Sequence, residues 1–279
     1  MTVFRAVAAV LIALAVAHQD RAWPTVYNVY AIRYATLADF PVSSLVAGAD
    51  PARRADIAMM FWLLEADDGA TVLFDAGFYN ESYIERWRPR NYVRPDRALA
   101  SLGIRLHDVT DIVVSHVHWD HMDGSGLFPG ATIWLQMEEY EYYVDADGRP
   151  RNRGIDQLGA ALLDRARRDG RLRLVDGDAI EIFPGITVYT GGRHTYASQY
   201  ISARTSRGTI VLASDNLYLY ENLDRGAAIA QTFDADANRR SHRRMLELVS
   251  DPRQVVPGHD PLVFDRFPRV SDNVVAIPR

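Results

Sequence analysis

Short apolar runs rich in β-branched residues recur along the chain and predict buried strands. Four of these runs occupy residues 112–114, 186–190, 209–214 and 254–256. Runs of this length and composition, bounded by Gly, Pro or polar residues, are expected for strands inside a packed sheet.

Apolar residues at helical spacing predict three helices, at residues 97–102, 156–168 and 241–249. In the second helix we expect the buried face to consist of Leu158, Ala161, Leu162 and Ala166, which recur at intervals near three and four. Helices are interspersed with strands in both halves of the chain. The periodicity alone therefore indicates mixed α and β structure without fixing a topology.

A cluster of metal-binding side chains follows the first predicted strand. Within six residues the chain has His116, His118, Asp120 and His121, and thus three of its eight histidines. Imidazole and carboxylate groups are the ligands that divalent zinc, iron, manganese or cobalt accept. The alternative is a solvated polar loop that happens to be rich in histidine, but the density of ligands favours a metal site.

One further candidate ligand follows each of the other predicted strands: His194, Asp215 and His259. Strands that end at one edge of a sheet would deliver these side chains to the same place. The remaining histidines lie in polar or helical surroundings. We expect surface or capping positions for them: His18, His107 and His242.

Together these segments resemble the metallo-β-lactamase superfamily, whose signature is His-x-His-x-Asp-His followed by an isolated His, an Asp and a final His. The resemblance starts at residues 60–64 and 71–77, which are similar to the family's early hairpin and its Asp-x-Gly turn, and it closes at residues 257–259. It implies an α/β fold, the four-layer αβ/βα sandwich.

The resemblance also implies two divalent metal ions, with Zn²⁺ as the first expectation and iron, manganese or cobalt as alternatives. One ion would be held by His116, His118 and His194. The other would be held by Asp120, His121 and His259, and Asp215 would bridge the two.

Within the superfamily, the chain is similar to the N-acyl-homoserine lactonase branch. It has no cysteine, which excludes the β-lactamase class that uses a cysteine ligand, and Asp215 argues against the class that lacks this aspartate. Tyr218 stands where the lactonase branch has a tyrosine that contacts the substrate carbonyl, and residues 134–142 also resemble that branch. The alternative for Tyr218 is an aromatic side chain packed at the strand end.

The segment around His194 departs from the lactonase pattern, which is Pro-Gly-His-Thr-Pro-Gly. This chain has Arg193 before the histidine and Tyr196 in the place of a proline. The departure leaves the metal ligands intact. It places a cation beside the site and puts the shape of the substrate pocket in doubt.

The resemblance implies a metal-dependent hydrolase that opens lactone rings, with N-acyl homoserine lactones as the first expectation and quorum quenching as the role. Tyr218 would stabilise the oxyanion, and Asp120 would pass a proton to the leaving oxygen. Alternatives on the same scaffold are hydrolysis of β-lactams, of other esters or lactones, or of thioesters. A di-iron redox role would need a flavin domain, for which the chain has no room, and a non-catalytic protein would be expected to have lost some ligands.

Composition fits a single metallo-hydrolase domain over residues 18–279. The chain is 48% hydrophobic and has a formal net charge of −5, and a chain of its length can bury a two-sheet core. Without a basic excess, we expect a small-molecule substrate and no nucleic-acid partner. The arginine clusters within 165–168 and 239–244 are interpreted as solvated helix faces.

Residues 1–17 have the features of a secretory signal peptide. Arg5 precedes an apolar run that ends at Ala15-Val16-Ala17, a small-residue cleavage site. The run is too short to span a bilayer comfortably, so we expect no membrane span in the mature form and a periplasmic or secreted location. The alternative is an N-terminal core or interface helix.

Aromatic and apolar residues of the 134–144 segment leave three interpretations open. They could line an acyl groove, form the surface of a homodimer or simply pack as one helix. The residues concerned are Met137, Tyr140, Tyr142 and Tyr143.

Overall fold

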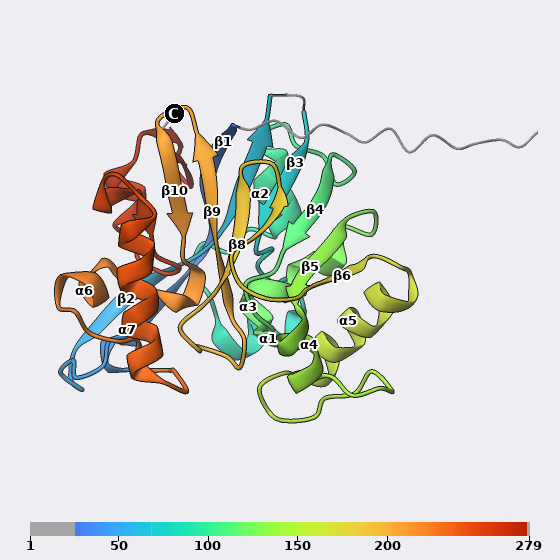
Figure 1. Ribbon diagram of the computed structural model, residues 1–279, viewed down its shortest axis with the longest axis horizontal. Helices are drawn as coiled ribbons and strands as arrows, with labels where there is room; N and C mark the ends of the chain where they lie inside the picture. Colours follow the sequence, from blue (N-terminus) through green and yellow to red (C-terminus); the bar gives the residue numbers. More distant parts are fainter. Residues whose placement is uncertain (1–25, 68, 278–279) are drawn as a thin grey trace, which may run out of the picture.

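The computed structural model describes residues 26–67 and 69–277 and contains two β-sheets (Figure 1). The larger sheet has the strand order β12-β13-β1-β2-β3-β4-β5-β6. Its strands are β1 (Tyr27–Pro41), β2 (Arg54–Ala66), β3 (Thr71–Phe74), β4 (Val109–Val113), β5 (Thr132–Gln136), β6 (Leu172–Val175), β12 (Arg269–Ser271) and β13 (Val274–Ile277). Strands β1 to β3 pair antiparallel, whereas β3 to β6 pair parallel.

The smaller sheet has the order β11-β10-β9-β8-β7. Its strands are β7 (Ile180–Phe183), β8 (Ile186–Thr190), β9 (Gln199–Thr205), β10 (Gly208–Leu212) and β11 (Val255–Val256). All pairs are antiparallel except β10 with β11. Each of the four strands predicted from sequence is therefore present, with ends that differ by one or two residues apart from the earlier start of β4.

Helices cover the outer face of each sheet. Five lie against the larger sheet: α1 (Glu81–Trp87), α2 (Pro95–Ala100), α3 (Trp119–Met122), α4 (Met137–Tyr143) and α5 (Gln157–Arg168). The long helix α7 (Ala235–Glu247) covers the smaller sheet, on the left in Figure 1. The short helices α6 (Tyr220–Asp224) and α8 (Val263–Arg266) contribute to the core between the sheets. This order of layers confirms the four-layer α/β sandwich.

Alternating side chains of β2 explain why the sequence shows a continuous apolar run there. Met60 and Trp62 belong to the core between the sheets, whereas Met59 and Phe61 belong to the core under the helices. A strand buried on both faces needs apolar residues at every position, in contrast to the alternation of a half-exposed strand.

Helix α5 begins where the sequence predicts, because Asp156 caps it by accepting a hydrogen bond from the N–H of Gly159. The predicted buried face is right only in part: Ala166 is buried and Leu162 packs against the core, but Leu158 is 46% exposed and Ala161 is exposed. The buried side is formed by Gly159, Ala160, Leu163, Asp164 and Ala166. Gly159 packs closely there: a Cβ at this position would lie 2.8 Å from Cε of Met122, so the end of that side chain would have to shift.

Two other helices begin earlier than the apolar spacing predicts. Helix α2 starts at Pro95, which suits the first helical position because its missing N–H would have no partner in the helix. Helix α7 starts at Ala235, because the carboxylate of Asp234 accepts hydrogen bonds from the N–H groups of Asp236 and Ala237. A proline at the first position of α2 and a capping carboxylate before α7 mark these starts, and apolar spacing registers neither.

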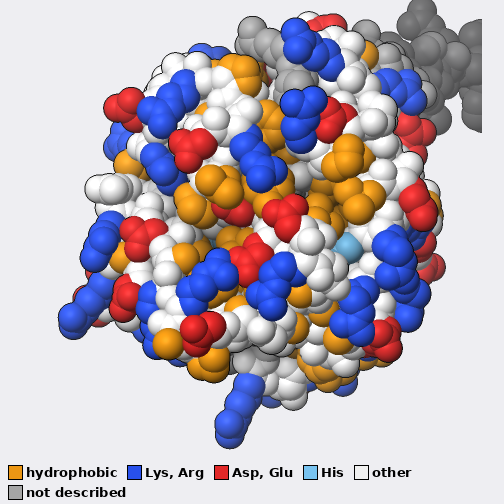
Figure 2. All heavy atoms as spheres, turned by 90° about the vertical axis from the view of Figure 1, so that its left-hand side faces the viewer, with side chains coloured by type: hydrophobic (Ala, Val, Ile, Leu, Met, Phe, Trp, Pro, Cys, Tyr) orange, Lys and Arg blue, Asp and Glu red, His pale blue; other side chains and the backbone are white. Residues whose placement is uncertain are grey.

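The arginines of α7 pair with nearby acids. Arg239 pairs with Asp236, and Arg244 lies 2.6 Å from Asp178. On the face of the molecule shown in Figure 2, basic and acidic side chains are interspersed, with apolar side chains in a recess between them.

None of the helices among residues 26–67 and 69–277 is long and apolar enough to cross a bilayer. The expected signal peptide at residues 1–17 lies outside the described residues and stays a prediction.

Candidate metal centre

The candidate ligands of the His-rich motif lie where β4 ends and α3 begins. His116 and His118 stand on the extended segment between the two elements, and His118 is the residue before the first turn of α3. Asp120 and His121 lie within that turn. The change from extended to helical backbone lets neighbouring residues of one short segment face two different groups of partners.

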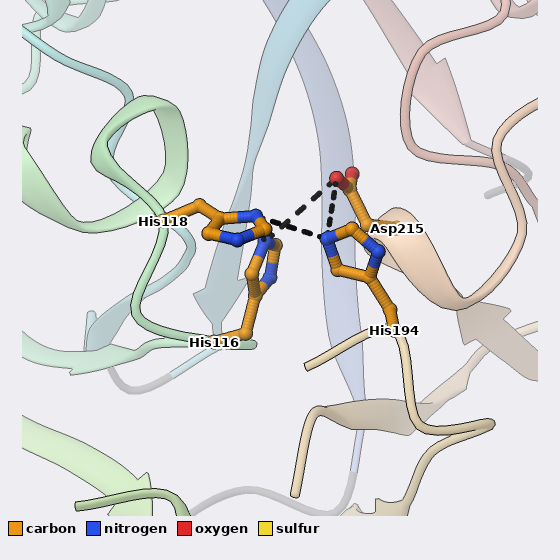
Figure 3. A group of neighbouring side chains, drawn as sticks. All are labelled: His116, His118, His194 and Asp215. Atoms are coloured by element: carbon orange, nitrogen blue, oxygen red, sulfur yellow. Dashed lines mark hydrogen bonds and ion pairs between the residues drawn. The ribbon is translucent and has the colours of Figure 1, made fainter. Parts of the chain in front are cut away.

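The other three candidates come from the smaller sheet and its edge. His194 follows β8, Asp215 lies in a 3-10 turn after β10 (η3, Ser214–Asn216), and His259 follows β11. The structure brings all seven predicted ligands together in two groups. One group contains His116, His118, His194 and Asp215 (Figure 3), and the other contains Asp120, His121 and His259.

Imidazole nitrogens converge in the first group. Nδ1 of His118 lies 3.0 Å from Nε2 of His116 and 3.0 Å from Nε2 of His194. Oδ2 of Asp215 lies 3.3 Å from Nε2 of His194 and 3.7 Å from that of His116. Figure 3 shows the four side chains pointing at one another from three separate segments.

The second oxygen of Asp215 faces the second group. Its Oδ1 lies 2.9 Å from Nε2 of His259 and 3.1 Å from Nε2 of His121. Oδ2 of Asp120 lies 3.5 Å from Nε2 of His121 and 3.9 Å from Nε2 of His259. Asp215 thus has one oxygen toward each group, which is the arrangement expected of a bridging carboxylate.

The donor atoms fit a pair of divalent cations. Nε2 of His121 and Oδ1 of Asp215 are buried and lie 3.1 Å apart, but their orientation does not satisfy hydrogen-bond geometry. Buried polar groups rarely lack a partner, so such atoms suit a bound cation. The opposite ring nitrogens are occupied: Nδ1 of His194 lies 2.9 Å from the carbonyl of Gln231, and Nδ1 of His259 lies 2.9 Å from that of Ala58. A proton on each Nδ1 leaves the Nε2 lone pair free for a metal.

The two groups differ in the direction in which their surroundings shift the pKa of a histidine. Burial and neighbouring imidazoles lower the pKa of His116 and bring that of His118 to about 3, so both rings are neutral ligands at neutral pH. Burial opposes protonation of His121 too, but the carboxylates of Asp215 and Asp120 outweigh it and raise its pKa. The second group therefore binds a proton where a metal would otherwise compensate the two carboxylates.

Asp75 holds the histidine motif in place, a role that the sequence reasoning missed. Its carboxylate accepts hydrogen bonds from the backbone N–H of Ser115 at 2.7 Å and from the hydroxyls of Ser115 and Ser214. It also lies 2.8 Å from Nδ1 of His121. The signal was present in the Asp-x-Gly turn at residues 75–77, since an acid at a strand end beside the motif can orient a ligand.

The hydroxyl of Tyr218 lies within the same site. It is 3.2 Å from Nδ1 of His194, and the side chain is buried. Tyr218 can reach the metal ligands only if the chain leaves β geometry after β10, which we expected between Asn216 and Leu217. The break is present but earlier, in the 3-10 turn of Ser214–Asn216, and Leu217 is extended again.

A cavity of about 230 Å³ opens onto the two groups of ligands. Its wall includes His118, Asp120, Asp215, Tyr218, Gln231 and His259 on one side, and Leu37, Phe40, Leu45, Ile57, Met59, Trp87 and Trp119 on the other. The apolar part comes from the β1–β2 hairpin and from α1 and α3. Residues of the 134–144 segment do not line this cavity, so the acyl-groove interpretation is wrong for it.

The remaining histidines are mostly outside the site. His107 is exposed, as expected. His242 is instead buried in α7, where its Nε2 lies 2.8 Å from the carbonyl of Asn216, so the expected surface or capping position is wrong. Its ring supports the turn that carries Asp215. His18 lies outside the described residues.

The departure around His194 has a structural explanation. Arg193 adopts a left-handed backbone (φ 59°), and its guanidinium lies 4.8 Å above the centre of the Tyr196 ring. Unlike a proline, Tyr196 has an N–H, which donates to the hydroxyl of Tyr143 at 3.3 Å. Neither Arg193 nor Tyr196 lines the cavity, so the cation beside the site does not enter it.

Comparisons with known proteins agree with this geometry. Residues 60–259 match the family model described as "Metallo-beta-lactamase superfamily". An N-acyl homoserine lactonase of a Bacillus species is 26% identical over 78% of this chain and 87% of its own length, and one of Bacillus cereus is 28% identical over the same shares.

Solved structures show the same fold. A quorum-quenching N-acyl homoserine lactone lactonase superposes with a TM-score of 0.69 at 24% identity, covering 86% of this chain and 94% of its own. A dizinc quorum-quenching lactonase, AidC, in complex with a homoserine product, gives 0.64 at 16% identity over 90% and 94%. With the family model spanning the whole ligand set, this chain belongs to the metallo-β-lactamase superfamily and is a hydrolase of that family.

Proposed function

We propose that this protein is a dinuclear metal-dependent lactonase that opens N-acyl homoserine lactones, with Zn²⁺ as the first candidate metal. The observation that carries the proposal is the place of Tyr218, whose hydroxyl lies beside the candidate ligands and on the wall of the apolar cavity. The curated lactonases, at about a quarter identity over most of their length, support the same substrate class.

Two divalent ions held by the seven ligands would lower the pKa of a coordinated water to roughly 7 and polarise the substrate carbonyl. The protein groups then have separate tasks. Water oxygen bonds to the carbonyl carbon, the ring C–O bond breaks, and a proton must reach the departing ring oxygen.

Tyr218 is placed to donate to the carbonyl oxygen as negative charge develops on it. Because Nδ1 of His194 carries a proton toward Gln231, the tyrosine oxygen can only accept from that ring. Its own proton is directed at the Asp215 carboxylate, and it would become available to the substrate carbonyl once that carboxylate binds the metals. Burial, and after it the charges of Asp215 and Asp120, raise the pKa of Tyr218, so it keeps this proton at neutral pH.

Asp120 is placed to carry the proton. Burial alone would raise its pKa, but the neighbouring His121 and His259 lower it, so the group is a carboxylate that can accept a proton from water. From the wall of the cavity it can then donate this proton to the ring oxygen, which becomes the hydroxyl of the open product.

The lining of the cavity favours an uncharged acyl lactone over a β-lactam. Its apolar wall suits an alkyl chain, and no Lys or Arg side chain is part of the lining. A β-lactam antibiotic carries a carboxylate, for which the lining offers no lysine or arginine partner.

A panel of substrates tests the proposal. Purified protein loaded with Zn²⁺ should open N-acyl homoserine lactones with a kcat/KM at least about a hundredfold above that for β-lactams and thioesters. Equal or faster turnover of a β-lactam or of a glutathione thioester would reject the lactonase assignment while leaving a metallo-hydrolase.

We also propose that the protein is exported and that residues 1–17 are removed. The support is the charge, apolar run and Ala15-Val16-Ala17 site in the sequence. Intact mass of the protein recovered from the periplasm or the medium of its native host decides the point, because retention of Met1 there would reject cleavage.

A further inference from the structure

Helix α4 carries a buried acid that has no part in the chemistry above. The Glu139 side chain is fully buried and does not line the cavity. Burial raises the pKa of Glu139 to about 7, while hydrogen bonds from Thr195, Ala197 and Val117 oppose that rise. A carboxyl group buried at such a cost needs a structural or functional reason.

The three donors to Glu139 come from the two segments that carry the three histidines of the first group. Its Oε1 accepts from the backbone N–H of Val117 at 3.2 Å and from the hydroxyl of Thr195 at 2.5 Å. Its Oε2 accepts from the N–H of Ala197 at 2.7 Å. Val117 lies between His116 and His118, and Thr195 directly follows His194.

We propose that Glu139 is a positioning residue that fixes the His116–His118 segment and the His194 loop at the spacing one metal ion requires. The two segments belong to different sheets, one following β4 and the other following β8. A single carboxylate joins them on the side away from the cavity. The inference rests on the metal centre proposed above and is independent of the substrate.

Other residues of α4 support the same loop. The hydroxyl of Tyr143 accepts from the N–H of Tyr196, and the ring of Tyr142 stacks on that of Tyr196 with centres 4.0 Å apart and planes 4° apart. These contacts favour the packed-helix interpretation of the aromatic segment, with the His194 loop as its partner.

Glu139 acts on one group of ligands and leaves the other to Asp75. Its hydrogen bonds go to residues beside His116, His118 and His194. Asp75 contacts His121 directly and reaches the first group only through Ser115, whose hydroxyl lies 2.8 Å from Nδ1 of His116. Loss of the Glu139 carboxylate should therefore weaken the binding of one of the two metal ions. A residue that merely stabilised the fold would affect both ions or neither.

Glu139→Gln tests the proposal at nearly constant volume. Either orientation of the amide places its NH₂ group opposite a backbone N–H, that of Val117 or that of Ala197, where an acceptor is needed. The matched control is Glu138→Gln, which changes an exposed acid in the same turn. Metal-free protein is titrated with Zn²⁺ in competition with a chromophoric chelator, so that both dissociation constants are measured without an activity assay.

We expect Glu139→Gln to raise one of the two dissociation constants by about tenfold or more and the other by less than about threefold. Glu138→Gln should leave both at the wild-type values. Two unchanged constants in Glu139→Gln, or an equal rise in both, would overturn the inference. Wild-type protein that binds no Zn²⁺ would instead overturn the metal centre itself, so the two failures are distinguishable.

Thr195→Val covers the case in which Glu139→Gln does not fold. It removes one donor and keeps both the carboxylate and the β-branched shape. The same dissociation constant should rise by a few fold, and an unchanged pair of constants in this variant would count against the proposal.

Discussion

The hydroxyl of Tyr218 lies 3.2 Å from Nδ1 of His194, on the wall of the cavity that opens onto the candidate metal ligands. This contact ties the proposed oxyanion donor to one of the ligands themselves. The 3-10 turn at Ser214–Asn216 makes it possible, since a straight continuation of β10 would turn the tyrosine to the opposite face.

Tyr218→Phe should lower kcat by about ten- to a thousandfold, because one oxyanion donor contributes a few kcal/mol to the transition state. The ring and its packing remain, so metal content should not change. Steady-state kinetics on an acyl homoserine lactone measures kcat, and elemental analysis measures the metal content. A rate within twofold of the wild type would show that the tyrosine only packs.

Trp87→Ala should impair long acyl chains more than short ones. The Trp87 ring stacks on Trp119 with centres 5.3 Å apart and planes 11° apart, and both line the cavity. Loss of this apolar surface should lower kcat/KM for a decanoyl substrate by roughly tenfold more than for a butanoyl substrate. Tyr142→Ala, in the segment outside the cavity, is the control. If Tyr142→Ala impaired the decanoyl substrate more than Trp87→Ala did, the acyl groove would lie along α4 instead.

Asp75→Asn should weaken the binding of the metal ion that the second group holds. The substitution removes a negative charge that orients His121 and leaves an amide that cannot accept from all of the present donors. Asn also tolerates the left-handed backbone of this position (φ 60°). We expect about a tenfold or greater rise in one dissociation constant for Zn²⁺. If chelator competition gave the wild-type constants, Asp75 would have no role in holding His121 for the metal.

The sequence predicted which candidate ligands lie together, because they follow strands and the order of strands along a sheet edge limits where their side chains lie. It did not predict the supporting residues. Asp75 and Glu139 act through hydrogen bonds to segments far away in the chain, and no periodicity marks them. The sequence did not predict the cavity wall either. Leu37 and Met59 come from a hairpin whose place over the ligands depends on tertiary packing.

The local sequence pattern also failed to predict which residues of a helix are buried. In α5 the larger residue Leu158 is exposed, while Gly159 is buried and packs closely against Met122 and Ile155. His242 lay in a polar stretch of sequence, yet it is buried because its ring has a carbonyl partner in Asn216. Complementary shape and hydrogen bonding across the core decided both outcomes.

The buried His242 predicts a pH dependence of stability. Burial lowers its pKa to about 4 in the folded protein, against about 6.5 for an unperturbed histidine. The unfolded chain therefore binds the proton more tightly, and the free energy of unfolding falls as pH drops from about 6.5 toward 4, by at most about 1.4 kcal/mol per pH unit from this group.

His242→Gln should be less stable than the wild type at pH 7 but lose less stability on acidification. Urea unfolding of the two proteins at pH 7 and pH 5 measures the difference. His107→Gln, at an exposed position, should follow the wild type at both values. Parallel loss of stability in wild type and His242→Gln would contradict a neutral, buried His242.

The most direct test is titration of the metal-free protein with Zn²⁺ while the opening of an N-acyl homoserine lactone is followed. Seven candidate ligands in two groups, with Asp215 facing both, predict two ions per chain. The initial rate should rise from near zero to a plateau at two equivalents. Full activity without added metal, a plateau at one equivalent, or no ring opening at saturating Zn²⁺ would contradict a dinuclear lactonase.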